Sequence, residues 1–194
     1  MKHLKPIILT LALFFTTQAH AILHVEPHLG YTLFGTGQSE ANPATMIKHN
    51  GTQYGLKLGA TYLNAMAGLD YNRSSFEQLT NGYRNDFSRS EVGIFVGYNF
   101  PGIVRTWLTY FFKNTQTATS DSSLIAKDSE YQGNTVELGA GYNGFHPLLS
   151  VNFLYRVIAQ DKLISGSTTT SLSGSDEISS KEIVLSVSCP LNFF

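Results

Sequence analysis

The sequence contains little charge, one cysteine and no long hydrophobic run after its N-terminal segment. Charged residues make up 14% of the 194 residues, whereas soluble domains average about 25%. A single cysteine, Cys189, excludes an internal disulfide, and we expect it to be a small apolar filler. No later stretch approaches the ~18 consecutive apolar residues that a membrane-spanning helix needs. The net charge of −1 gives no indication of a nucleic-acid partner.

The N-terminus has the three parts of a secretory signal peptide. Lys2 and Lys5 supply the positive charge, and an apolar run follows over residues 7–15. This run is too short to cross a bilayer as a helix, which argues against a retained anchor. Ala19-His20-Ala21 matches the small-x-small cleavage pattern, so we expect cleavage after Ala21 and a single mature domain over residues 22–194.

What the sequence does contain is alternation. Residues 91–112 change between apolar and polar or glycine residues with a period of two, which is the period of a β-strand. Pro101-Gly102 interrupts the pattern and predicts a tight turn, so the segment is expected to form a hairpin. Six more segments show the same period. The eight predicted strands cover residues 22–34, 52–63, 65–73, 91–100, 104–112, 134–142, 148–158 and 180–194.

Two all-β folds bury such strands differently. In a soluble sandwich the apolar faces pack against each other, whereas in a membrane barrel they face lipid. The connections favour the barrel, because long polar segments (35–51, 74–90, 114–133 and 159–179) alternate with short turns. This asymmetry is typical of outer-membrane barrels, which have long loops outside and short periplasmic turns. Tyr54 and Tyr62, at the two ends of one strand, fit the aromatic girdles of such a barrel.

The strand number, the loop asymmetry and the terminal Phe194 resemble the small eight-stranded outer-membrane β-barrels of the OmpA and OmpX type. The resemblance covers Ile22 to Phe194 and implies an all-β, eight-stranded antiparallel up-and-down transmembrane barrel in a Gram-negative outer membrane. It also implies contact with outer-membrane lipids and lipopolysaccharide, and a monomer inserted by barrel-assembly machinery that reads Phe194. The alternate residues before Phe194 are polar, however, so the strand either bulges near Pro190 or ends off register.

The mixed face predicts a polar network in the lumen. An eight-stranded barrel is just wide enough for side chains to fill it, and buried charges must pair. We therefore expect ion pairs to plug the lumen, together with Lys113, His24 and His28; a gated or narrow channel for small or apolar solutes is the alternative. The predicted network residues are Glu26, Lys57, Asp70, Glu91, Arg105, Glu137, Arg156 and Glu182.

Metal binding and catalysis are weaker readings. His24-x-Glu26-x-His28 has metal-ligand residue types on one strand face, but alternate residues lie about 6.6 Å apart, so neighbouring strands would have to help. No His-x-Ser pair, as in lipid A deacylase barrels, is present. Loop residues His49, Asp86 and Asp121 match the palmitoyl-transferring barrels only in type. We predict no cofactor, no metal and no enzymatic activity.

The predicted role is structural or surface-interacting, with the barrel as anchor and the four long loops as contact surface. Phe76, Leu79, Tyr83 and Phe87 are expected to give the second loop contact surface, unless they extend the strands above the membrane. Pro27 and Pro190 lie on the first and last strands, which must pair to close the barrel. We therefore expect this closing ladder, the seam, to have fewer hydrogen bonds at its lower, periplasmic end.

Overall fold

The computed structural model describes residues 22–193 except 40–41, 81, 102, 122–124, 147 and 173–177. The predicted signal peptide and Phe194 lie outside this part. Among the described residues, no helix is long and apolar enough to cross a membrane. The strands are β1 (Ile22–Ser39), β2 (Asn42–Tyr62), β3 (Ala65–Thr80), β4 (Tyr83–Asn99), β5 (Val104–Ala118), β6 (Glu130–His146), β7 (Leu149–Ser165), β8 (Thr168–Ser171), β9 (Ile178–Ser188) and β10 (Leu191–Phe193).

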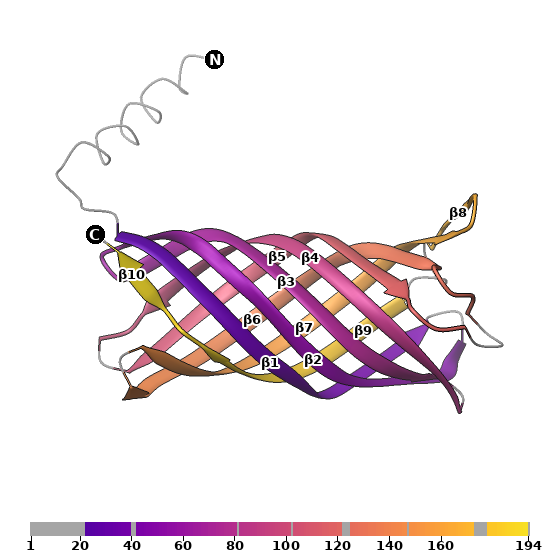
Figure 1. Ribbon diagram of the computed structural model, residues 1–194, viewed down its shortest axis with the longest axis horizontal. Helices are drawn as coiled ribbons and strands as arrows, with labels where there is room; N and C mark the ends of the chain where they lie inside the picture. Colours follow the sequence, from indigo (N-terminus) through magenta and orange to yellow (C-terminus); the bar gives the residue numbers. More distant parts are fainter. Residues whose placement is uncertain are drawn as a thin grey trace, which may run out of the picture.

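The strands form a closed antiparallel ring. Each strand from β1 to β7 pairs with the next, and β9 pairs with both β7 and β1, which closes the sheet. Strand β10 continues β9 along β1, and β8 is a short strand that pairs only with the end of β7. The wall therefore consists of eight strands, with β9 and β10 counted as one (Figure 1). The predicted up-and-down barrel is therefore confirmed, and the two-layer sandwich is excluded.

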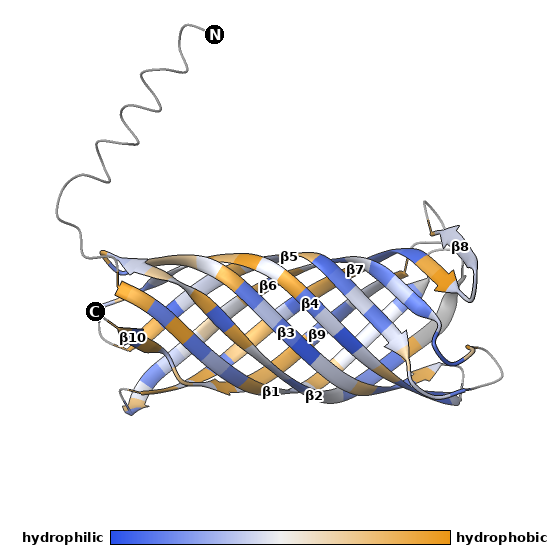
Figure 2. Cartoon of the chain, turned by 45° about the horizontal axis from the view of Figure 1, so that its top comes forward, coloured by the Kyte–Doolittle hydropathy of each residue, from blue (hydrophilic) through white to orange (hydrophobic). Residues whose placement is uncertain are grey.

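The two faces of the wall have opposite character. Along each strand, hydrophobic and hydrophilic residues alternate (Figure 2). On β1 the outward apolar side chains run from Leu23 to Phe34, both more than half exposed. Eleven residue-to-residue steps at ~3.3 Å each, tilted by about 45°, span roughly 26 Å, which matches the apolar band of a membrane barrel. Tyr54 and Tyr62 also lie on this outer face.

Three of the four segments predicted as long loops (35–51, 74–90 and 159–179) are mostly paired strand, which corrects the prediction, whereas only the two ends of 114–133 belong to β5 and β6. Strands β3 and β4 pair without interruption up to Thr80 and Tyr83. The error arises because most side chains of these outer extensions are polar, with only isolated aromatic residues on the inner face, and such sequences resemble loops. Phe76 and Phe87 are buried inside the barrel and stack with ring centroids 5.7 Å apart, so they are not outer contact surface. Leu79 and Tyr83 do face outward.

Three strands carry an extra residue at a similar height in the wall. The register shifts at Leu33–Phe34 in β1, at Phe112–Lys113 in β5 and at Asp161 in β7. A bulge inverts the inside–outside alternation beyond it. Lys113, predicted to face the lumen, is consequently exposed on the outer wall, and Asn114 takes the inward place.

The pairing at the lower end of the seam shows whether the last strand bulges near Pro190. His28 pairs with Ser188 and Val25 with Leu191 in one unshifted register, so the strand does not bulge near Pro190. The outward aromatic at this end is Phe193, which is 49% exposed. Strand pairing is interrupted between β9 and β10, where the Cys189 N–H donates to the Pro27 carbonyl at 3.0 Å.

The two prolines do not contribute equally to this gap. Pro27 has no N–H with which to return the bond from Cys189. Because bonding directions alternate along an antiparallel strand, the Pro190 nitrogen faces away from β1. One proline, rather than both, therefore removes a donor from the seam.

Pro27→Ala should complete the seam locally. The new amide at position 27 is expected to donate to the Cys189 carbonyl and exchange slowly with deuterium, while the free energy of unfolding stays within about 1 kcal/mol of wild type because the lost rigidity of proline offsets the bond. Hydrogen exchange by NMR in micelles measures this, with the wild-type Cys189 amide as the protected reference. Fast exchange at position 27 would show that the seam is open for another reason.

Candidate functional site: a charged lumen below an outer vestibule

The lumen is filled by three layers of polar side chains, and the lowest is built around Glu26. Arg105, across the barrel on β5, donates to Glu26 with both terminal nitrogens, one of them at 2.7 Å. The His24 ring lies 3.1 Å from the same carboxylate and 3.0 Å from the Asn192 oxygen. Arg105 also donates to Ser188 at 3.0 Å. This layer therefore ties β1, β5 and the last strand together.

The middle layer is organised by Trp107. Its indole N–H donates to Glu137 at 3.1 Å. Two cations lie over its ring, with Lys57 Nζ at 5.1 Å and the Arg105 guanidinium at 4.9 Å from the centroid. Lys57 makes an ion pair of 2.9 Å with Asp70. Apolar side chains pack around this layer; they are Met66, Phe95, Trp107, Leu154 and Val184.

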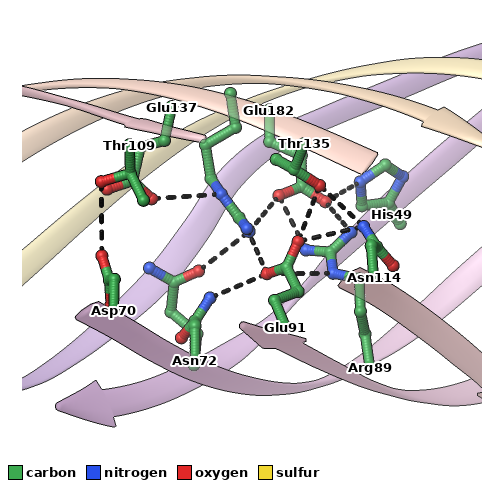
Figure 3. A network of polar contacts seen from close by, with 12 residues as sticks. His49, Asp70, Asn72, Arg89, Glu91, Thr109, Asn114, Thr135, Glu137 and Glu182 are labelled. Carbon is green, nitrogen blue, oxygen red and sulfur yellow. Dashed lines mark hydrogen bonds and ion pairs between the residues drawn. The ribbon is translucent and has the colours of Figure 1, made fainter. Parts of the chain in front are cut away.

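The upper layer centres on Arg156, which has no accessible surface. Its guanidinium contacts three carboxylates: it pairs with Glu91, lies 2.9 Å from Glu182 and 3.3 Å from Glu137. Arg89 adds a two-pronged pair with Glu182 at 2.8 and 2.9 Å. Figure 3 shows Arg89, Glu91, Glu137 and Glu182 of this layer pointing toward one another.

Neutral groups complete the upper layer. Glu91 accepts hydrogen bonds from Asn72 at 3.1 Å, Asn114 at 3.0 Å and Thr135 at 2.8 Å (Figure 3). The His49 ring lies 2.7 Å from Glu182. The Glu91 and Glu182 carboxylates thus each have partners from several strands, which offsets the cost of removing these charges from water.

Among the residues that the structure describes, the charged side chains at mid-height are shielded from water. Glu91, Arg156 and Glu182 are each at most 1% exposed. A water-filled path would touch the side chains that line it. A conducting path would therefore expose at least some of these side chains.

Above the plug the barrel holds a vestibule of about 180 Å³. Gln78, Gln116 and Gln160 bring amide groups from three strands, and Gln160 donates to Gln116 at 2.8 Å. Phe76 and Tyr131 supply aromatic surface. Burial raises the pKa of the Tyr131 phenol, so the group stays protonated and can donate a hydrogen bond at neutral pH. The vestibule combines amide and phenol groups and the Arg89 guanidinium with apolar walls.

Solved structures with this architecture are known. No protein-family model and no curated protein matches the sequence. Neisserial surface protein A matches over 86% of this chain and 96% of its own, with 16% identity and a TM-score of 0.53. Ail of Yersinia pestis matches over 87% of this chain and 99% of its own, with 13% identity and a TM-score of 0.54. The chain has the fold of the small eight-stranded outer-membrane β-barrels.

Within this barrel, all eight residues of the predicted network lie inside. Each is at most 4% exposed, and each has an oppositely charged partner. His24 joins the lowest layer, and His28 lies beside Gly55. Lys113 is the exception, because the β5 bulge turns it outward.

The sequence-based network missed Arg89 and His49. Both fall in segments that were predicted as loops, so their inward parity was not considered. Continuing the alternation upward from Glu91 on β4 would have placed Arg89 on the same face, since residues two apart share a face. On β2, His49 shares the inward face of Gln53 and Lys57 in the same way.

Among the described residues, those considered for a metal site and for catalysis do not come together in one site. His24 and Glu26 are engaged with each other and with Arg105 and Asn192, and the described part of the barrel holds no group of three or more potential ligands. His49 contacts Glu182 inside the lumen, while Asp86 faces out from β4. Of the three residues named for a transferase, His49 and Asp86 therefore lie on opposite faces of the wall, and Asp121 accepts a hydrogen bond from the Lys127 N–H at 2.6 Å in the connection after β5.

Proposed function

We propose that this protein is a surface-interaction protein of a Gram-negative outer membrane, exported with cleavage after Ala21. The barrel anchors it, and the paired strand extensions with their vestibule contact ligands outside. The observation that carries the proposal is the combination of a closed plug at mid-height with a cavity above it. A plug favours anchoring over conduction, whereas a cavity open to one side favours binding.

The similar structures support the same direction. Ail bears the name of an attachment invasion locus protein, and its structure contains the heparin analogue sucrose octasulfate. Both the Ail and the Neisserial surface protein structures match this chain over almost their whole length. By analogy, the outer end of this chain is the part that we expect to meet a partner.

A deletion strain tests the proposal against transport. Attachment to host cells is expected to fall in the deletion strain, whereas uptake of small apolar solutes should stay unchanged. Complementation with the wild type should restore attachment, and complementation with Gln116→Ala/Gln160→Ala should not. Thr117→Ala, on the outer side of β5, is the matched control and should restore it. Lost uptake with normal attachment would instead assign the barrel to transport.

A further inference from the structure

The outer wall carries a polar groove of about 220 Å³ that the surface-interaction role does not use. It lies across β5, β6 and β7. Tyr110 and Phe112 form its apolar edge, and the Lys113 and Lys162 side chains are both exposed beside it. Its remaining lining is Asn114, Thr115, Gln132, Gly133, Asn134 and Asp161.

Two bulges build this groove. Strands β5 and β7, on either side of β6, each insert one residue at this height. Without the insertions, Lys113 would share the inward face of Phe111, and Lys162 that of Gln160. The bulges therefore bring two lysines to the outside that uninterrupted strands would bury. Between them, a Cβ at Gly133 would lie 1.9 Å from the Ala159 carbonyl oxygen, so only glycine fits there.

The two lysines are available for a ligand. Among the described residues, neither ammonium group has a carboxylate within 4.0 Å, although Asp161 lines the same groove. Two cations against one carboxylate leave the groove with a net charge of +1. The side-chain amide of Asn134 adds a neutral donor, whereas the Gln132 amide already donates to Glu130 at 2.5 Å.

The height of the groove indicates what it meets. Tyr110 and Phe112, 45% and 53% exposed, end the apolar band of β5, and the groove begins directly beyond them. Aromatic side chains at this place mark the boundary between hydrocarbon and headgroups. Cations at such a boundary attract the anionic headgroups of lipids.

We propose that this groove binds a phosphate group of an outer-leaflet lipid headgroup, with Lys113 and Lys162 as the charged contacts and the Asn134 amide as a donor. The proposal rests on the outer-membrane location given above, but not on the surface-interaction role. It gives the two bulges a function, since they redirect both lysines to the level at which lipid phosphates lie.

Native mass spectrometry of the purified barrel with bisphosphorylated lipid A tests this. The variant Lys113→Gln/Lys162→Gln is expected to bind this lipid about 30-fold more weakly than wild type, at roughly fivefold per lysine. Lys48→Gln, which removes an exposed cation from the outer wall of β2, is the matched control and should bind as wild type does. Dephosphorylated lipid A should bind wild type and double variant equally weakly.

Two results would overturn the proposal. Equal binding of bisphosphorylated lipid A by wild type and double variant would remove the lysines from the site. Displacement of the lipid by millimolar inorganic phosphate would assign the groove to a soluble anion. The lipid-binding measurement does not depend on whether the vestibule variants still support attachment. Failure of the groove and failure of the proposed function can therefore be told apart.

Discussion

Arg156→Ala is expected to lower the free energy of unfolding by about 3–5 kcal/mol and to let ions through the barrel. The guanidinium is fully buried and contacts Glu91, Glu137 and Glu182. Its removal leaves three carboxylates close together with Arg89 as the remaining arginine of their layer. Carboxylates in that position repel one another and draw in water, so the layer that seals the lumen should open.

Urea unfolding in detergent, followed by the fluorescence of the single tryptophan, measures the stability, and planar-bilayer recording measures the conductance. Arg84→Ala is the matched control. Arg84 also pairs with a glutamate, Glu77, at 3.3 Å, but its side chain is 72% exposed, and exposed pairs contribute at most about 1 kcal/mol. This control should remain stable and closed.

A second substitution separates charge from packing. If the cost of Arg156→Ala is the uncompensated charge, adding Glu91→Gln should recover part of the stability and reduce the conductance. If the cost is the cavity left by the large side chain, the second substitution should change neither quantity. A stable, closed Arg156→Ala barrel would mean that the ion pairs do not form the seal.

The architecture was readable from the sequence because a strand has one short period and the barrel has one hydrophobic face. Val92, Ile94 and Val96 show their orientation without knowledge of any partner strand. Parity gives the face of a residue but not its height. The pairing of Glu26 with Arg105, 79 residues apart, depends on the register of several strands, and the sequence does not contain that information in local form.

Inserted residues account for the clearest error. A bulge adds one residue to a strand and inverts the parity of everything beyond it, yet it leaves no compositional mark. Lys113 follows Phe111 by two residues and was therefore placed inside, whereas the insertion at Phe112 sends it outside. The outer extensions were misread for a different reason. Above the membrane the outer face meets water and most inner-face side chains are polar, with Phe76 and Phe87 as exceptions, so the continuous apolar period that marks a strand is absent there.

Gly139→Ala is expected to displace Trp107 and to destabilise the barrel by about 1–3 kcal/mol. Gly139 pairs with Trp107 across the β5–β6 ladder, and a Cβ at this glycine would lie 2.1 Å from the indole ring. The indole cannot move freely, because it donates to Glu137 and because Lys57 and Arg105 lie over its ring. Displacement would therefore disturb the middle layer of the lumen as well.

The chain has one tryptophan, so its emission spectrum reports on this site alone. A shifted emission maximum together with a lower urea midpoint is the expected result for Gly139→Ala. Ala140→Val changes the neighbouring residue, whose side chain faces lipid, and should leave the emission unchanged and the stability within about 0.5 kcal/mol. Unchanged emission in Gly139→Ala would mean that the wall yields instead of the indole. The close contact of Trp107 with the β6 backbone would then not be what holds the ring between the two cations and Glu137.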